Sequence, residues 1–286
     1  MSRITYVNGQ YVPSRDAMVH VEDRGYQFAD GVYEVCEVFH GALIDEPRHL
    51  ERLARSLAEL QIDAPLGQGA LAIVLREIIA RNKVANGYIY IQATRGVAPR
   101  DHAFPPKCVR PSLVVTARTV DPEKGEMTAR KGVTVATMPD LRWKRVDIKT
   151  ISLIANVLAR QEAKERGAYE AWLIDSDGMV VEGAASNAWI IDRSGTIITR
   201  HIDHFVLRGI TRTTLIDIIA AEGLKLEERR FSLDEAFSAQ EAFITGATTL
   251  IMPVVGIDGR KIGAGAPGPL AQRLRAIFHD TAVRTL

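Results

Sequence analysis

The chain is 286 residues long and carries 36 lysines and arginines against 35 aspartates and glutamates, for a net charge of +1. This balance gives no sign of a nucleic-acid or membrane-surface partner, and no apolar run approaches the ~18 residues of a membrane span. Two cysteines, Cys36 and Cys108, exclude a disulfide framework, and no apolar signal stretch opens the sequence, so we expect a cytoplasmic protein. His201 and His204, without nearby cysteines, are expected to be loop histidines, and no metal site is predicted.

The first part of the chain alternates short β-rich runs with two helices. Asn8-Gly9 suits a type I′ turn and predicts a hairpin over Ile4–Tyr11. A second turn at His40-Gly41 joins strands at Val32–Phe39 and Ala42–Ile44. Leucines recur on one helical face within Pro47–Ile62, with proline in the first turn, which predicts a helix. We further expect a helix at Leu71–Arg81 and strands at Tyr88–Thr94 and Leu113–Val120.

The polar segment Asp121–Gly132, with one proline and two glycines, is expected to be the linker between a smaller N-terminal domain (1–120) and a larger C-terminal domain (133–286). The second domain is expected to hold strands at Val133–Thr137, Ala171–Ile174 and Ala188–Ile191 and helices at Ser152–Arg166, Thr213–Glu222 and Leu270–Val283. Ser232 and Glu235 form a possible capping box. Strands clustered into hairpins with interspersed helices predict the α+β class.

Three clusters of polar residues stand out against this pattern. They are Arg24–Val35 around Tyr33, Arg142–Thr150 around Lys149, and Val180–Asn187 around Glu182. Taken singly, each has an ordinary interpretation: Lys149 as a solvated lysine, Glu182 as an acid at a strand end, and Tyr33 as a half-buried sheet aromatic.

Taken together and in this order, followed by Gly209-Ile-Thr-Arg212, the clusters resemble the fold-type-IV pyridoxal-phosphate enzymes. The segments EDRGYQFADGVYEV, DIKT and VEGAASN carry the resemblance, which runs from about residue 3 to residue 280. The group includes branched-chain aminotransferases, D-amino-acid transaminases, R-selective amine transaminases and aminodeoxychorismate lyase. The resemblance implies two α+β domains with pyridoxal 5'-phosphate in a cleft between them, working as a homodimer.

The resemblance also assigns roles to individual residues. Lys149, placed in the C-terminal domain, would form the Schiff base with the cofactor and move the substrate proton, with Arg142 and Arg145 as candidate neighbours that keep its amine neutral. Glu182 would face the pyridine nitrogen. The remaining cofactor contacts implied are Arg52, the Ile210 and Thr211 amides at a helix start and Thr248 for the phosphate, and Leu207 for the ring.

The loop Ala98-Pro-Arg100-Asp-His102 resembles that of the D-amino-acid transaminases. There the arginine and histidine come from the partner subunit and, with the tyrosine matching Tyr33, hold the substrate α-carboxylate. The alternatives are a branched-chain L-amino-acid or R-amine transaminase, a carbon–carbon lyase and a non-catalytic protein of this fold. The chain departs from the pattern of the D-specific enzymes at Ala184 and Ala185, where that pattern has serines, and at Ala247, where it has a threonine near the phosphate.

Overall fold

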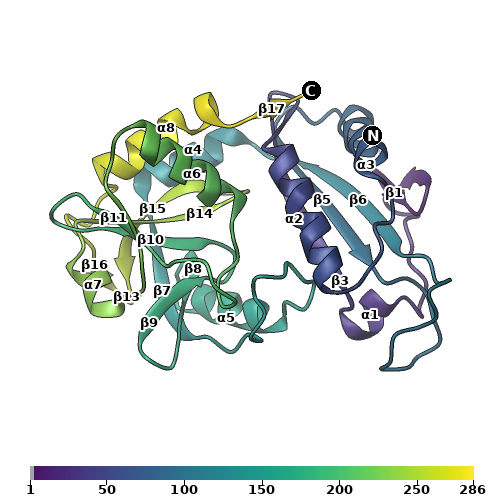
Figure 1. Cartoon of the computed structure of the whole chain (residues 1–286). Helices are drawn as coiled ribbons and strands as arrows, with labels where there is room; N and C mark the ends of the chain where they lie inside the picture. Colours follow the sequence, from purple (N-terminus) through teal and green to yellow (C-terminus); the bar gives the residue numbers. More distant parts are fainter. Residues whose placement is uncertain (1–2) are drawn as a thin grey trace. The chain divides into compact units, whose positions relative to one another are not determined.

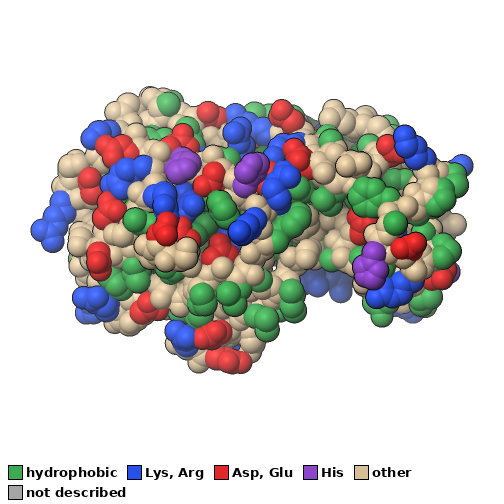
Figure 2. All heavy atoms as spheres, turned by 60° about the horizontal axis from the view of Figure 1, so that its bottom comes forward, with side chains coloured by type: hydrophobic (Ala, Val, Ile, Leu, Met, Phe, Trp, Pro, Cys, Tyr) green, Lys and Arg blue, Asp and Glu red, His purple; other side chains and the backbone are tan. Residues whose placement is uncertain are grey.

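A computed structural model describes residues 3–286, and the chain forms two compact units (Figure 1). Unit 1 comprises Met1–Asp121, Ile148–Ser152 and Val283–Leu286, and unit 2 comprises Pro122–Asp147 and Leu153–Ala282. Each unit is built on its own sheet with helices packed against it, so the α+β prediction is confirmed. In Figure 2, basic and acidic side chains are interspersed on the face shown, in keeping with the net charge of +1.

The sheet of unit 1 is antiparallel throughout. Its strands, in spatial order, are β17 (Arg284–Thr285), β4 (Ala42–Ile44), β3 (Gly31–Phe39), β5 (Gly87–Thr94), β6 (Ser112–Thr119), β1 (Ile4–Val7) and β2 (Gln10–Pro13). Both hairpin turns are confirmed, because the central residues take the positive φ angles of a type I′ turn: 45° and 96° at Asn8 and Gly9, and 50° and 82° at His40 and Gly41.

Two long helices cover this sheet and complete its core. They are α2 (Glu46–Glu59) and α3 (Gln68–Asn82), and a single short turn of helix, α1 (Arg24–Phe28), precedes β3. Leu50, Leu53 and Leu57 are buried on α2 as the sequence pattern predicts. The helix ends earlier than predicted, because Gln61 adopts a left-handed φ of 54°.

The sheet of unit 2 mixes parallel and antiparallel neighbours. Its strands, in spatial order, are β12 (Leu226–Glu228), β11 (Ile197–Thr199), β10 (Asn187–Ile191), β14 (Glu241–Gly246), β15 (Leu250–Ile257), β7 (Val133–Pro139), β8 (Glu170–Ile174), β9 (Met179–Gly183) and β13 (Phe231–Ser232), with β16 (Arg260–Lys261) beside β15. Its helices are α4 (Pro122–Lys131), α5 (Ile154–Glu165), α6 (Ile210–Ala221), α7 (Leu233–Ser238) and α8 (Pro269–Thr281). The capping box of Ser232 and Glu235 is present at the start of α7.

The division of the chain differs from the predicted one in two respects. The expected linker Asp121–Gly132 is mostly helix α4, which belongs to unit 2. The segment Ile148–Ser152, and with it Lys149, packs in unit 1 rather than in the C-terminal unit, because Thr150 forms a bridge to Val32 on β3. Strand β9, which carries Glu182, agrees with the ordinary interpretation of Glu182 as an acid at a strand end, although no bounds were predicted for this strand.

Among the described residues, no helix has the length and apolar character needed to cross a membrane. Within residues 3–286, no group of three or more His, Cys, Asp or Glu side chains is placed to hold a metal ion.

Candidate functional site

Glu182, in unit 2, is a buried carboxylate with three hydrogen-bond donors around it. It lies on β9 and is 3 % exposed. Arg142 Nη1 donates to its Oε1 at 2.5 Å, Asn187 Nδ2 donates to its Oε2 at 2.8 Å, and the Leu207 amide nitrogen lies 3.3 Å from Oε2. Burial raises the pKa of the Glu182 carboxyl, and the guanidinium of Arg142 opposes that rise. The group is therefore a fixed acceptor that would gain from a further cationic donor.

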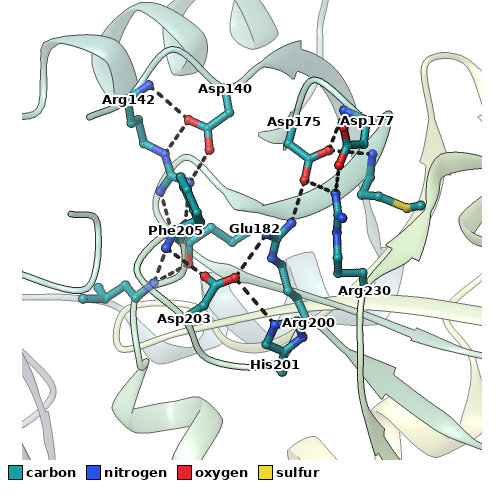
Figure 3. Close-up of polar contacts among 12 residues, drawn as sticks. Asp140, Arg142, Asp175, Asp177, Glu182, Arg200, His201, Asp203, Phe205 and Arg230 are labelled. Carbon is teal, nitrogen blue, oxygen red and sulfur yellow. Dashed lines mark hydrogen bonds and ion pairs between the residues drawn. The ribbon is translucent and has the colours of Figure 1, made fainter. Parts of the chain in front are cut away.

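Arg142 joins Glu182 to a second carboxylate (Figure 3). Its Nε and Nη2 donate to Asp140 at 2.8 and 2.7 Å, while Nη1 serves Glu182, and its side chain is only 5 % exposed. Arg145 pairs with Asp147 at 2.9 Å. The structure thus pairs both arginines with carboxylates of unit 2, whereas the sequence suggested them as neighbours of Lys149.

The loop that brings Leu207 to Glu182 is anchored by a second group of ion pairs, also drawn in Figure 3. Arg200 donates to Asp175 at 2.8 Å and to Asp203 at 3.2 Å, and Asp203 accepts the Phe205 amide at 2.8 Å. Arg230 shares the Asp175 carboxylate at 2.8 Å. Because one end of the loop is fixed in this way, the Leu207 amide is held facing Glu182. Leu207 itself is half-buried, and its role against a cofactor ring remains a prediction.

The start of α6 offers unfilled backbone donors. The helix begins at Ile210, three residues earlier than predicted, and its N-cap Gly209 provides no side-chain hydrogen bond. Ile210 and Thr211 are both buried at its first turn, where free amides favour an anion. A Cβ on Gly209 would lie 2.2 Å from Asn187 Oδ1, so only glycine lets Asn187 pack here. Asn187 also donates to the Leu207 carbonyl at 2.9 Å and so joins Glu182 to the helix start.

The turn after β14 provides a hydroxyl that the sequence did not single out. The register pairs Asn187 on β10 with Thr245, so the following turn lies at the same end of the sheet as Asn187. Thr248 is exposed there. The neighbouring Thr249 Oγ1 is buried and has no hydrogen-bond partner within the described part of the chain. An orphaned buried hydroxyl of this kind fits an oxyanion ligand and makes Thr249 a candidate beside Thr248.

Lys149, in unit 1, has its backbone fixed and its amine unpaired. Its amide donates to Ser56 Oγ at 3.3 Å, and its carbonyl accepts the Tyr33 amide at 3.0 Å. The Lys149 Nζ lies 4.2 Å from the centroid of the Tyr33 ring. Among residues 3–286 this amine has no carboxylate partner, so it can react or exchange a proton. Tyr33 stacks in turn on Tyr90, and burial raises the pKa of Tyr90 to about 12.

Arg52, also in unit 1, forms a bidentate pair with a buried acid. Its Nε and Nη2 donate to Glu34 at 2.6 and 2.8 Å, and His49 Nδ1 lies 2.8 Å from the same carboxylate. Burial would raise the pKa of Glu34, but Arg52 and His49 outweigh it and lower the value to about 2. Glu34 therefore stays charged at neutral pH and fixes the guanidinium in place.

Arg100 and His102 lie together in unit 1 on an exposed loop. The Arg100 Cζ is 4.6 Å from the centroid of the Phe28 ring, and the His102 ring is 5.4 Å from it. Within residues 3–286 neither side chain has a carboxylate partner, and neither makes a ring contact or hydrogen bond with Tyr33. The structure thus brings the predicted carboxylate-binding pair together beside one aromatic ring.

Asn187 and Thr249 are the candidate residues that the sequence interpretation missed. Asn187 ends the segment VEGAASN that was singled out for Glu182, and a polar amide entering an otherwise apolar strand, Asn-Ala-Trp-Ile-Ile, was a usable signal. Thr249 had no distinguishing signal, because only the fold shows that its hydroxyl is buried and unpaired.

The chain is similar to known proteins over nearly its whole length. The model of one protein family, amino-transferase class IV, matches residues 31–257. D-alanine aminotransferase of Bacillus licheniformis is 39% identical over 274 residues, which cover 96% of this chain and 95% of the relative. D-alanine aminotransferase of Staphylococcus haemolyticus is 38% identical over 274 residues, 96% of each chain.

Solved structures agree on the fold. A branched-chain amino acid aminotransferase of T.th., solved with pyridoxamine 5'-phosphate, superposes with a TM-score of 0.89 at 27% identity, covering 98% of this chain and 94% of that one. A branched-chain amino acid aminotransferase from Escherichia coli gives 0.86 at 22% identity, with 98% and 94% covered, which supports the fold alone.

Proposed function

This chain belongs to the class IV aminotransferase family, and we propose that it uses pyridoxal 5'-phosphate to exchange an amino group between a D-amino acid and a 2-oxo acid. D-alanine and D-glutamate are the proposed donors, and pyruvate and 2-oxoglutarate the corresponding oxo acids. Two relatives named D-alanine aminotransferase, 39% and 38% identical over 96% of the chain, support this choice. The similar branched-chain enzyme of T.th. is 27% identical, so the branched-chain alternative has weaker support.

The residues present fit the proposed cofactor. In unit 2, the buried Glu182 suits a protonated ring nitrogen, and the open first turn of α6 at Ile210 and Thr211 suits a phosphate, with the Thr248–Thr249 hydroxyls as further donors. Leu207 is proposed to pack on the ring. In unit 1, Lys149 offers an unpaired amine for covalent attachment, and Arg52, fixed by Glu34, is the proposed guanidinium for the phosphate.

When bound, pyridoxal phosphate supplies an electron sink for the electrons released at the substrate Cα. The chain's residues do the rest. The Lys149 Nζ removes the Cα proton and returns a proton in the opposite half-reaction, which requires a neutral amine. Glu182 would pair with the protonated ring nitrogen, and Arg142 opposes the rise in the Glu182 pKa that burial causes. The two half-reactions give ping-pong kinetics.

One observation carries the proposed D-specificity: Arg100 and His102 stand on one aromatic ring with no acid among residues 3–286 to neutralise them. A guanidinium binds a carboxylate through two parallel hydrogen bonds, and a histidine adds a third donor. With the substrate amine fixed and the Cα–H bond directed at Lys149, the carboxylate and side chain must choose between two positions. If Arg100, His102 and the Tyr33 hydroxyl bind the carboxylate at one of these positions, the side chain must take the other. Only one enantiomer then fits.

We also propose that the enzyme is a homodimer in which Arg100 and His102 serve the site of the partner subunit. Helix α5 supports an interface, since Ala163 is its only buried residue. Three apolar side chains on its first turns are largely exposed in the isolated chain: Ile154 at 68 %, Val157 at 57 % and Leu158 at 63 %. Contiguous exposed apolar surface of this kind is typical of a protein–protein contact.

The proposal is tested by incubating the purified holoenzyme with 2-oxoglutarate and either D-alanine or L-alanine and measuring pyruvate. We expect pyruvate from D-alanine only. Pyruvate from L-alanine alone, or turnover of L-leucine in the absence of turnover of D-alanine, would contradict it.

A further inference from the structure

Phe28, the last residue of α1, collects three positively charged or titratable side chains around its ring. The Cζ atoms of Arg24 and Arg100 lie 4.8 and 4.6 Å from the ring centroid, and the His102 ring lies 5.4 Å from it. We propose that Phe28 is a positioning residue, which holds Arg100 and His102 in a common orientation for the substrate carboxylate before substrate arrives. The inference rests on the proposed function and deepens it by naming what orients the carboxylate-binding pair.

The Phe28 ring packs beside a buried ion-pair cluster of Arg24, Arg95 and Asp30, called here the Asp30 clamp. Arg24 and Arg95 are 3 % and 8 % exposed and share the carboxylate of Asp30, with Nε to Oδ2 distances of 2.8 and 2.7 Å. Arg24 Nη1 also donates to the carbonyl of Asp101 at 2.6 Å. Arg24 of the Asp30 clamp therefore contacts the Phe28 ring and also fixes the backbone at Asp101, between Arg100 and His102.

A second cation–π contact secures the far side of the loop. The Arg95 Cζ lies 3.7 Å from the centroid of the Phe104 ring. Three of the contacts that attach the loop to the rest of unit 1 are the Arg24 hydrogen bond at Asp101, the Phe104 ring on Arg95, and the Phe28 ring beside Arg100 and His102. Only the Phe28 contact acts directly on the side chains that are proposed to bind substrate.

Of the two arginines beside Phe28, Arg24 forms an ion pair with a carboxylate in the described part of the chain and Arg100 does not. Arg24 has an ion-pair partner in Asp30, whereas Arg100 is exposed and has no carboxylate within ion-pair distance among residues 3–286. An anionic ligand is therefore the natural counter-ion of Arg100. The face of an aromatic ring attracts a guanidinium but leaves its positive charge in place. A carboxylate partner would neutralise that charge. Phe28 thus orders Arg100 and keeps it available, so less conformational freedom is lost when substrate binds.

The test compares Phe28→Leu, which keeps an apolar side chain of similar reach but removes the ring, with Phe28→Tyr, which keeps the ring. Steady-state kinetics with D-alanine should show a KM about two- to thirtyfold higher in Phe28→Leu, the range that loss of a cation–π contact implies, with kcat nearly unchanged. Phe28→Tyr should keep the wild-type KM. Propionate, a carboxylate that cannot react, should inhibit Phe28→Leu more weakly by the same factor. Phe28→Met replaces Phe28→Leu if the latter does not fold.

Combination with Arg100→Leu separates positioning from general stability. If Phe28 acts through Arg100, removing its ring in the Arg100→Leu background should raise KM by a smaller factor than in wild type. The proposal is overturned if that factor is unchanged, if Phe28→Tyr is as impaired as Phe28→Leu, or if Phe28→Leu keeps the wild-type KM. A wild-type enzyme that does not transaminate D-alanine would refute the proposed function itself, a result distinguishable from all three.

Discussion

Replacement of Arg142 tests whether the charge on Glu182 depends on its buried partner. In Arg142→Met, Glu182 loses the 2.5 Å hydrogen bond and the charge that offset its burial, while Asp140 loses two hydrogen bonds. Removing one member of a buried ion pair destabilises the folded protein by about 3–5 kcal/mol, because the other charge is left buried without a partner. The pKa of Glu182, already raised by burial, should rise further, which favours the neutral carboxyl over the carboxylate.

The sign of the pH dependence follows from that shift. A carboxyl with a raised pKa is ionised only at higher pH, so the low-pH side of the kcat profile for Arg142→Met should move towards higher pH. At neutral pH we expect turnover to fall by up to about 10²- to 10³-fold, since each 1.4 kcal/mol is tenfold, and to recover partly on raising the pH. Activity in Glu182→Gln, which has no group to ionise, should be low at every pH.

Steady-state transamination of D-alanine between about pH 6 and pH 9 provides the assay. Arg145→Met is the matched control, because it removes an arginine from the same segment that pairs with Asp147. Its profile should keep the wild-type shape. An Arg142→Met profile that coincides with wild type, or one displaced towards lower pH, would refute the reasoning.

Three further outcomes are expected. Lys149→Ala should still bind pyridoxal phosphate but lose the absorption band of the lysine-bound cofactor and all turnover; a borohydride-reducible bond in this variant would point to another lysine. Gly209→Ala should weaken cofactor binding, measured by cofactor release on dilution, because its Cβ would lie 2.2 Å from Asn187 Oδ1; unchanged release would contradict the proposed role of the α6 start. Mixing inactive Lys149→Ala with inactive Arg100→Ala should restore activity after subunit exchange, because one site of the mixed dimer keeps both residues; no rescue would argue for a site within one chain.

Helix α4 shows which part of the fold could have been read from the sequence. Pro122 opens it, Glu123 lies in its first turn, Arg130 and Lys131 lie in its last, and Gly132 follows with a φ of 73°. These are standard helix boundaries. The segment was predicted to be a linker because it is polar and contains one proline and two glycines. In the structure the helix buries only Ala129, so the sequence shows no apolar stripe that would have indicated it.

The position of Lys149 could not be derived from sequence, since it depends on non-local pairing. Nothing in DIKT shows that Thr150 bridges Val32, which lies far earlier in the chain, and this bridge places the lysine in unit 1. Arg142 is a similar case. Proximity in sequence suggested Lys149 as its neighbour, whereas the fold directs its guanidinium to Glu182 on β9. By contrast the hairpin turns and the core face of α2 follow local rules and were predicted.

The ratio of kcat/KM for D-alanine to that for L-leucine in the wild-type enzyme tests the central claim most directly. A charge-assisted hydrogen bond to the carboxylate is worth about 1.5–3 kcal/mol, and burying an unpaired guanidinium costs a comparable amount. An L-amino acid loses the first and incurs the second, so we expect D-alanine to be preferred by roughly 10³-fold or more. A preference for L-leucine would contradict the account and would favour a branched-chain aminotransferase instead.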